Sequence, residues 1–401
     1  MIKFLQVAHF ISPGLSYQEN IYCSELSKYS ELDNYIISAS KNYPKSMGYA
    51  NLQKMFPSRD IIPGCYYEEK VKSIRLYPTI EIGFKLWLKE LISSIKIIQP
   101  DIILVHGVTN LSTLRIALYK LLFRKKFKLL VDDHSIKTLS SSWYNKIFKL
   151  LFSQIVNTAV DCYLPISEET MSIIRNNYGC NGNFKILRLG ANDKVFFQDF
   201  NKRNAFRKKY NIKDKENVFL FTGKINSSKG VDIIIKAFAQ ICEQFPLSSL
   251  FLVGVYDDTY MENLKKLIDT LNISKKIYIH NNVSTIDLAN YFNGADIGLW
   301  PFSETISVIE AQLCGLPVIV NASEISKDRI NYTSKNPSGY IVTLEKEQQE
   351  NDLYTQMLSF CKNTDKTTMQ KNALLNSKKY KNSEIIKELI SIIKYHYDKT
   401  K

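Results

Sequence analysis

The chain has 401 residues, of which 45% are hydrophobic and 23% charged, and its formal net charge is +14 at pH 7. This composition excludes an intrinsically disordered chain, and the length favours two domains of roughly 150–200 residues each. The basic charge favours acidic partners such as nucleic acid, an anionic membrane surface or a phosphorylated substrate.

Cysteine usage and hydropathy predict a cytoplasmic protein. The seven cysteines are scattered singly, without a C-x-x-C pair, which is typical of reduced thiols rather than of a disulfide framework or a zinc site. We expect no signal peptide, because the sequence MIKFLQVAHF leads directly into a strand-like run. No apolar run reaches the roughly 18–20 residues that a membrane-spanning helix needs. The protein is therefore expected to be soluble, or peripheral on the inner face of a membrane.

Short apolar runs alternate with helical patterns through the first half of the chain. Strands are predicted at residues 2–8, 35–38, 73–77, 101–105, 127–131 and 161–166. Helices are predicted at residues 17–29, 84–98, 111–123, 144–158 and 168–177. This alternation is typical of an α/β domain with a doubly wound parallel sheet. The turn after the first strand, which includes Gly14, is the usual place for a ligand to approach backbone N–H groups.

Two of the five histidines follow predicted strands. His106 comes directly after residues 101–105, and His134 comes after residues 127–131 and two aspartates. Ligands of open α/β sheets bind at the carboxyl ends of the strands. A single histidine at such a place is more often structural than catalytic, so the pattern leaves open whether one of the two contacts a substrate.

Residues 118–128 and 144–152 mix lysine and arginine with leucine, phenylalanine and tyrosine. One interpretation is two ordinary surface helices whose lysine side chains extend along apolar surface. The other is an interfacial patch that rests on anionic lipid and brings the active site to a lipid-linked acceptor. The sequence leaves both interpretations open.

The second half repeats the alternation after a polar, basic segment at residues 201–216, whose composition predicts a hinge between domains. Strands are then predicted at residues 218–222, 250–255, 276–280, 297–300 and 318–320, and helices at residues 231–242, 260–271, 285–292 and from residue 306. These elements predict a second doubly wound sheet. We place the domains at residues 1–190 and 191–382, followed by a C-terminal helix at 383–401, with the option that it packs back on the first domain.

A turn with two glycines and two lysines, GKINSSKG, separates a predicted strand from a predicted helix. Gly223 and Gly230 permit close backbone approach, and Lys224 and Lys229 add positive charge. The helix that follows presents its amino-terminal N–H groups, so the turn favours a diphosphate. It is not a Walker A loop, because the order G-x-x-x-x-G-K-[ST] is not met. Gly254 lies near the end of the next predicted strand.

Glu310 lies in the first turns of a helix that follows a buried strand, with Ser307 three residues earlier on the same face. A lone glutamate on an amphipathic helix is usually solvated. Here the neighbours Ile309, Ala311 and Leu313 indicate a packed helix, and a carboxylate at such a buried edge needs a partner. Beside the carboxyl end of a strand, it is well placed to hold the two hydroxyl groups of a ribose.

These motifs, in this order, resemble the GT-B glycosyltransferases, specifically the large retaining family 4 (glycosyl transferases group 1). That family carries a G-R-x…K-G loop and E-x7-E followed by A-x-x-x-G-x-P-V, which residues 223–230 and 310–318 match here. His134 matches the strand-end histidine of the family, and residues 189–193 (LGAND) resemble its N-G-V-D turn. The resemblance covers essentially the whole chain and is strong in residues 218–321.

The resemblance implies two doubly wound Rossmann-like domains facing across a cleft. It also implies a nucleoside-diphosphate sugar as co-substrate, with no cofactor and no metal. Lys224 and Lys229 would hold the donor diphosphate, and Glu310 would bind the donor ribose. His134 would lie near the donor sugar or the acceptor hydroxyl. His134, Lys229 and Glu310 are thus the predicted catalytic residues, and His106 has positional support alone on the acceptor side.

Two positions depart from the family's pattern. The family's arginine is Lys224 here, which keeps the charge but loses the bidentate fork. The first glutamate of E-x7-E would fall at Phe302, and Glu304 is the nearest carboxylate. Either Glu304 reaches the sugar, or backbone groups around residues 305–307 take that place, or the enzyme is impaired. The predicted donor-binding residues are Gly14, Gly223, Lys224, Lys229, Gly254, Glu304, Thr305, Ile306, Ser307 and Glu310.

We therefore expect a retaining, metal-independent hexosyltransferase that moves a sugar to a cell-surface glycan or lipid-linked acceptor of the capsule, O-antigen or exopolysaccharide type. The alternative is a non-catalytic GT-B subunit or scaffold, because the first glutamate is missing. A nucleic-acid partner is not expected, since that role rests on net charge alone and lacks a readout motif. An anionic membrane surface stays an open partner.

Overall fold

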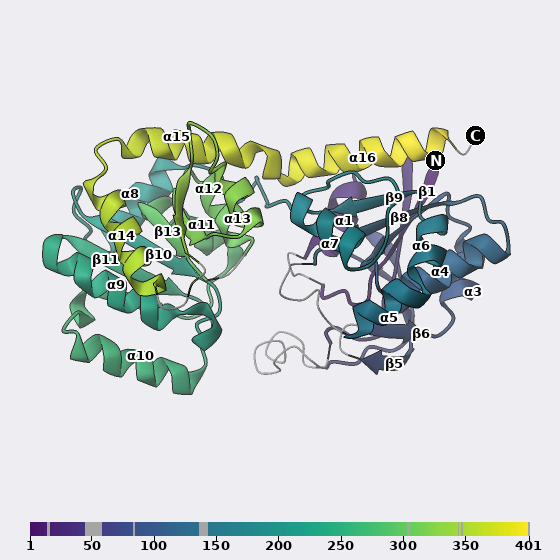
Figure 1. Cartoon of the computed structure of the whole chain (residues 1–401), viewed down its shortest axis with the longest axis horizontal. Helices are drawn as coiled ribbons and strands as arrows, with labels where there is room; N and C mark the ends of the chain where they lie inside the picture. Colours follow the sequence, from purple (N-terminus) through teal and green to yellow (C-terminus); the bar gives the residue numbers. More distant parts are fainter. Residues whose placement is uncertain are drawn as a thin grey trace. The chain divides into compact units, whose positions relative to one another are not determined.

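The computed structural model describes residues 1–13, 17–44, 58–82, 85–135, 143–302, 305–343, 345 and 348–399. The chain divides into two compact units (Figure 1). The first unit comprises Met1–Leu189 and Ile385–Lys401, and the second comprises Gly190–Glu384. Two predicted donor-binding residues, Gly14 and Glu304, lie outside the described residues.

The first unit is built on a seven-stranded sheet with the order β3-β4-β2-β1-β7-β8-β9. Neighbouring strands are parallel, apart from the antiparallel pair β3 and β4. The strands are β1 (Ile2–Val7), β2 (Leu32–Ala39), β3 (Gly64–Glu68), β4 (Val71–Leu76), β7 (Ile102–His106), β8 (Lys128–Asp133) and β9 (Cys162–Pro165). A separate antiparallel hairpin joins β5 (Pro78–Ile82) to β6 (Lys85–Leu88).

Helices cover both faces of this sheet. On β1, Phe4 belongs to a hydrophobic cluster with α1 and α16, whereas the next residue, Leu5, belongs to another with α3, α4 and α6. Both side chains are fully buried, as expected for a parallel sheet covered on both faces. The helices are α1 (Gln18–Leu26), α3 (Leu91–Ile98), α4 (Leu111–Leu122), α5 (Trp143–Leu151), α6 (Ser153–Ala159), α7 (Glu168–Asn176) and the C-terminal α16 (Asn382–Asp398).

The second unit has a six-stranded sheet with the order β12-β11-β10-β13-β14-β15, and all its pairs are parallel. The strands are β10 (Asn217–Thr222), β11 (Ser248–Val253), β12 (Ile277–His280), β13 (Ile297–Trp300), β14 (Val318–Asn321) and β15 (Gly339–Val342). The helices are α8 (Phe200–Lys209), α9 (Val231–Gln244), α10 (Asp258–Thr270), α11 (Thr285–Gly294), α12 (Ser307–Leu313), α13 (Glu324–Ile330), α14 (Gln349–Lys362) and α15 (Lys366–Ser377). No helix in the described part of the chain is long and apolar enough to cross a membrane.

Each sheet reverses its winding direction once. In the first unit the chain proceeds from β1 outward to β2 and β4, and then returns to β7 on the other side of β1. In the second unit it proceeds from β10 to β11 and β12, and then returns to β13 on the other side of β10. Ligands of open α/β sheets bind at the carboxyl ends of the strands at such a switch point. The fold therefore singles out the ends of β1 and β7, and of β10 and β13.

One predicted helix is partly a strand. The sequence predicts a single helix over residues 84–98, but its first part forms β6 and pairs with β5. Leu86 and Leu88 are fully buried, and Trp87 between them is 39% exposed, which is the alternation of a strand. The chain then turns through Glu90, which has a left-handed φ of 63°, before α3 begins.

Two further predictions are wrong in their local structure. The polar residues 201–216 are not a hinge, because their first part forms α8 within the second unit. Asp199 caps this helix by accepting a hydrogen bond from Asn201 N–H at 2.9 Å, and Phe206 packs against Phe251. The predicted helix 144–158 is two helices, α5 and α6, because the backbone breaks at Phe152.

Candidate functional site

The turn after β10 is fixed by backbone contacts with the turn after β11. Gly223 N–H donates to Val253 O at 3.0 Å, and Ile225 N–H donates to Val255 O at 2.8 Å. Gly254 has a φ of 150°, and a Cβ added there would lie 1.8 Å from Gly223 O. Because no larger residue fits in this space, the two turns depend on glycine for their close approach.

Both predicted lysines lie on this turn. Lys224 is exposed, and Lys229 is partly buried at the end of a 3-10 turn, Ser227–Lys229. Gly230, with a left-handed φ of 59°, then caps α9. The amino terminus of a helix carries about half a positive charge. Two cationic side chains and a helix terminus therefore meet on one turn, and this is an arrangement that suits a diphosphate.

The segment after β13 packs on the same turn. Trp300 Nε1 donates to Thr222 O at 2.8 Å, which ties the end of β13 to the end of β10. A Cβ on Gly230 would lie 2.2 Å from the ring of Phe302, so this ring covers the start of α9. Phe302 is the residue that stands where the first glutamate of E-x7-E would fall. The two segments that carry Lys229 and Glu310 thus leave adjacent strands and contact each other.

Glu310 lies in the first turn of α12, which follows this segment. Burial raises the pKa of Glu310 to about 7, and a hydrogen bond from Ser307 opposes the increase in part. Thr305 Oγ1 accepts from Ser307 N–H at 3.3 Å, and Thr305 O accepts from Arg329 at 2.8 Å. Ile306 packs against the hydrophobic core. The entry into α12 is thus fixed. Among the described residues, Ser307 donates to the Glu310 carboxylate, and this bond does not offset the effect of burial on its pKa. Ribose hydroxyl groups could supply further donors.

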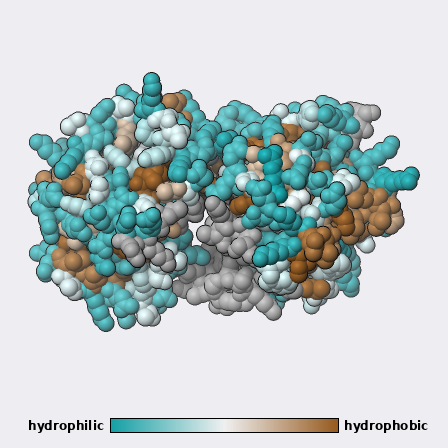
Figure 2. Space-filling model, in the orientation of Figure 1, coloured by the Kyte–Doolittle hydropathy of each residue, from teal (hydrophilic) through white to brown (hydrophobic). Residues whose placement is uncertain are grey.

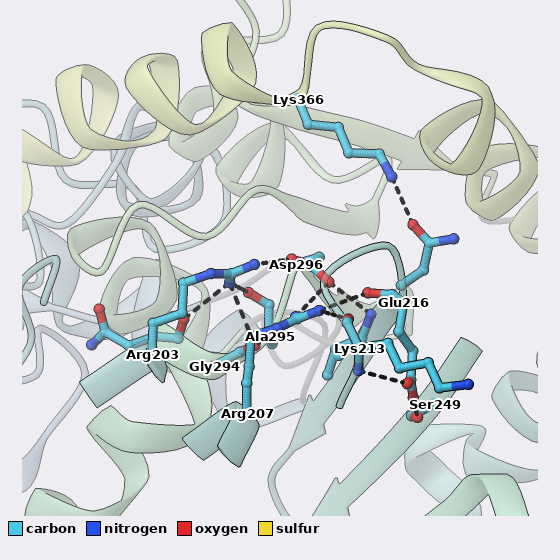
Figure 3. A network of polar contacts seen from close by, with 12 residues as sticks. Arg203, Arg207, Lys213, Glu216, Ser249, Gly294, Ala295, Asp296 and Lys366 are labelled. Atoms are coloured by element: carbon cyan, nitrogen blue, oxygen red, sulfur yellow. Dashed lines mark hydrogen bonds and ion pairs between the residues drawn. The ribbon is translucent and has the colours of Figure 1, made fainter. Parts of the chain in front are cut away.

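A second polar network of this unit lies at the opposite, amino-terminal edge of the sheet (Figure 3). Asp296, just before β13, pairs with Arg203 at 2.6 Å and with Arg207 at 3.2 Å. Its carboxylate also accepts from Val218 N–H at 2.9 Å, at the start of β10. Both arginines come from α8, so this network fastens α8 to the strands. We interpret it as structural.

In the first unit, one carboxylate joins the two predicted histidines. His106 Nδ1 donates to Asp132 Oδ2 at 2.7 Å, and His134 Nε2 lies 3.7 Å from the same oxygen. The other nitrogen of His106, Nε2, lies 3.2 Å from Gln6 Oε1 on β1. These residues lie at or near the carboxyl ends of β1, β7 and β8. The first unit therefore has its own polar cluster beside the switch point.

The Asp132 carboxylate stabilises the charged form of both histidines, and the two histidines oppose each other weakly. For both His106 and His134, burial lowers the pKa and the Asp132 carboxylate raises it, and the net change is upward. For Asp132, burial raises the pKa and the two histidines lower it, and the net change is strongly downward. His106 is 8% exposed and both its ring nitrogens are occupied, whereas the His134 side chain is 35% exposed. Of the two, His134 is accessible to a ligand.

Sequence reasoning missed Asp132, Gln6 and the contact of Phe302 with Gly230. Asp132 had a detectable signal, because it follows the apolar run at 127–131 and lies two residues before a candidate histidine. Gln6 had none, since its partner lies 100 residues away in sequence. The contact of Phe302 depends on β10 and β13 being neighbours, which the order of elements does not state.

Comparison with known proteins identifies the matched part of the second unit. Residues 202–373 match the family described as "Glycosyl transferases group 1". The match covers less than half of the chain and lies within the second unit. The matched residues contain the turn after β10 as well as Glu310, so the residues predicted to bind the donor in this unit all lie within the match.

Relatives and solved structures extend the likeness. An uncharacterized glycosyltransferase of Methanocaldococcus jannaschii is 26% identical over 265 residues, 63% of this chain and 62% of that protein. A GDP-mannose-dependent mannosyltransferase of Corynebacterium glutamicum, which acts on a monoacylated phosphatidylinositol monomannoside, is 27% identical over 42% of this chain and 46% of that protein. The chain thus aligns with less than two thirds of either relative's length.

The structural likeness covers the whole chain. Sucrose-phosphate synthase of Thermosynechococcus elongatus superposes with a TM-score of 0.69 at 16% identity, over 99% of this chain and 100% of that one. Anabaena HepE in complex with UDP gives a TM-score of 0.72 at 13% identity, over 98% and 100% of the two chains. The fold is the GT-B fold of two Rossmann-like α/β units, as the sequence predicts.

Proposed function

We propose that the chain is a retaining glycosyltransferase of family 4, which moves a sugar from a nucleoside-diphosphate sugar to a cell-surface glycan or lipid-linked acceptor. The observation that carries the proposal is the meeting of two segments at the switch point of the second sheet. One segment bears Lys224 and Lys229, and the other bears Glu310. A cationic turn beside a carboxylate that needs hydrogen-bond donors fits a nucleoside diphosphate.

The turn after β10 would stabilise the leaving group. When the bond between the sugar and the diphosphate breaks, negative charge develops on the diphosphate. Lys224, Lys229 and the amino terminus of α9 would surround this charge, and preorganised groups of this kind would lower the barrier without a metal ion. We therefore expect sugar transfer to continue in the presence of EDTA.

Glu310 and His134 would take the two remaining roles. Glu310 would accept hydrogen bonds from the ribose hydroxyl groups and hold the donor in register. His134, with its raised pKa, would donate a hydrogen bond to the donor sugar or to the acceptor. Asp132 keeps His134 charged, and His106 supports Asp132 from the other side, so we assign His106 a positioning role.

The names of similar proteins support a nucleotide-sugar donor but differ in its base. Anabaena HepE has been crystallised with UDP-glucose, and the Corynebacterium relative depends on GDP-mannose. Acceptors differ as well, because other relatives are named D-inositol 3-phosphate glycosyltransferases. The proposal for this chain is therefore the reaction class, with a surface glycan or lipid-linked acceptor as the expected context.

A panel of nucleoside-diphosphate sugars, assayed for slow hydrolysis by the purified chain, tests the proposal. Hydrolysis of one donor should fall at least 100-fold in Lys229→Ala and in Glu310→Ala. Lys265→Ala is the matched control, because Lys265 is an exposed lysine on α10 of the same unit. NMR of a transferred glycoside should show the anomeric configuration of the donor. Full activity in both site variants would refute the assignment of the site.

The alternative is a GT-B subunit that binds nucleotide without catalysis. The observation that favours it is Phe302, which stands at the position of the first glutamate of E-x7-E. Its apolar ring lies over Gly230, at the start of α9. Under this alternative, nucleotide would raise the melting temperature of the chain, and no donor in the panel would be hydrolysed. Slow hydrolysis of any donor would exclude it.

A further inference from the structure

The outward face of α5 is a stripe of exposed apolar side chains. Trp143, Ile147, Leu150 and Leu151 are 72, 41, 82 and 57% exposed. They recur at the i, i+4, i+7 and i+8 spacing of one helix face. The helix is held to the unit by its other side, where Phe148 is 1% exposed and packs on Tyr178. The stripe is therefore additional to the face that folding buries.

The end of α4 adds to this apolar surface. Leu121, Leu122 and Phe123 are 37, 73 and 61% exposed. The helix α6, which follows α5, packs on α4. Figure 2 shows hydrophobic residues gathered over the region that Figure 1 draws as α4 and α5. Exposed apolar residues that occur singly are ordinary, but a contiguous group of this size indicates an interaction surface. We call these seven residues, Leu121–Phe123, Trp143, Ile147, Leu150 and Leu151, the apolar face.

The stretch of chain that carries the apolar face has an excess of positive charge. Residues 102–160 contain nine lysine and arginine residues, and their only carboxylates are Asp132 and Asp133. Both aspartates are buried at the end of β8, with 2 and 4% exposure. Lys126 and Lys146 are exposed on the segments that carry the apolar face. Asp161, which follows this stretch, pairs with Lys120 and Lys128. Exposed lysines such as Lys126 and Lys146 supply the remaining positive charge beside the apolar residues.

We propose that the apolar face binds a membrane surface rich in anionic lipid. Trp143, Leu150 and Leu151 would enter the boundary between headgroups and acyl chains, and the lysines would lie among the lipid phosphates. A second copy of the chain fits less well, because it would bring like charges together. Nucleic acid would leave the exposed leucines without an apolar partner. Membrane binding does not depend on sugar transfer. Its consequence, access to a lipid-linked acceptor, rests on the proposed function.

Vesicle flotation of the full chain, without nucleotide, tests this proposal. The chain should bind vesicles of phosphatidylcholine and phosphatidylglycerol (3:1) at least tenfold better than vesicles of pure phosphatidylcholine. The double variant Leu150→Gln/Leu151→Gln should reduce binding to the anionic vesicles at least tenfold. Lys126→Gln/Lys146→Gln should reduce it by about tenfold or more, and added salt should weaken the binding of the wild type.

The second unit supplies matched controls. Ile286 and Leu375 are 68 and 56% exposed there, so Ile286→Gln/Leu375→Gln removes comparable apolar surface. Lys265→Gln/Lys266→Gln removes two exposed lysines of α10. Both control variants should bind anionic vesicles like the wild type. Circular dichroism and thermal unfolding should show that every variant remains folded.

Tryptophan fluorescence gives a second readout. Trp143 is 72% exposed, whereas Trp300 is 1% exposed. Anionic vesicles should shift the emission of the wild type to shorter wavelength, and Trp143→Phe should lose this shift.

Three results would overturn the proposal. The first is equal binding of the wild type and Leu150→Gln/Leu151→Gln to anionic vesicles, including no binding by either. The second is a dimer that this variant dissociates, since the face would then be covered by a second copy. The third is binding to single-stranded RNA that the variant abolishes. A chain that binds vesicles but hydrolyses no donor would refute the proposed function and leave this proposal standing.

Discussion

Glu310 is a carboxylate that the folded protein holds partly neutral. Its pKa is about 7 in the folded protein, against an ordinary value of 4.5. Between these pH values the unfolded chain has lost the proton while the folded chain retains it. Stability contributed at this position is therefore fully present near pH 4.5 and is lost as the pH rises through 7.

We predict that Glu310→Gln stabilises the second unit by roughly 2 kcal/mol at pH 8 and by almost nothing at pH 5. Urea unfolding measures the difference, followed by fluorescence in a Trp87→Phe/Trp143→Phe background, in which Trp300 of the second unit is the remaining tryptophan. The control is Glu262→Gln on α10, an exposed position. A stabilisation that is the same at both pH values would show that Glu310 is not the titrating group.

Asp132 raises the pKa of two histidines and so favours their charged form. We predict that Asp132→Asn lowers the pKa of both His106 and His134, because each loses the carboxylate that opposes its burial. The first unit should lose about 3–5 kcal/mol of stability, since a buried charge is left without its partner. NMR titration of labelled histidines measures the change, and His280 of the second unit is the internal control. Unchanged titration of both histidines would contradict this role of Asp132.

At the scale of elements, the contact between the turn after β10 and the end of β13 can be measured. We predict that Gly230→Ala destabilises the second unit by about 2–3 kcal/mol, because it forces a Cβ into the left-handed region and against Phe302. In a Phe302→Ala background the same change should cost about 1 kcal/mol, which is the backbone part alone. Gly64→Ala is the control, since the nearest atom to its added Cβ would lie 3.7 Å away, at an ordinary contact distance. Equal costs in both backgrounds would rule out the contact.

Elements with a strong local pattern could be predicted from the sequence. The run IGLW is β13, and the sequence predicts both its ends correctly. The hairpin β5–β6 could not be predicted, because residues 85–88 become a strand through pairing with a partner strand. The helix at the start of residues 201–216 could not be predicted for a related reason. Two of its charges, Arg203 and Arg207, face the unit and pair with Asp296. This pairing and the packing of Phe206 show only in the folded unit.

At the scale of the whole molecule, the fold class follows from the alternation of strands and helices, and the solved structures confirm it. The candidate residues of the second unit could be found from the sequence, because Lys229 lies on a glycine-flanked turn and Glu310 lies at the start of a helix that follows an apolar strand. The polar cluster of the first unit could be predicted only in part. His106 and His134 could be found as strand-end residues, but their roles differ because Asp132 and Gln6 meet them across three strands.

The central claim is that the turn after β10 and Glu310 bind the same nucleotide. Isothermal titration of UDP and GDP at pH 8 tests it most directly, with the wild type, Lys229→Ala, Glu310→Ala and the control Lys265→Ala. We predict that one nucleotide binds the wild type and the control equally, and each site variant at least tenfold more weakly. A nucleotide that binds all four proteins with the same affinity would contradict the account.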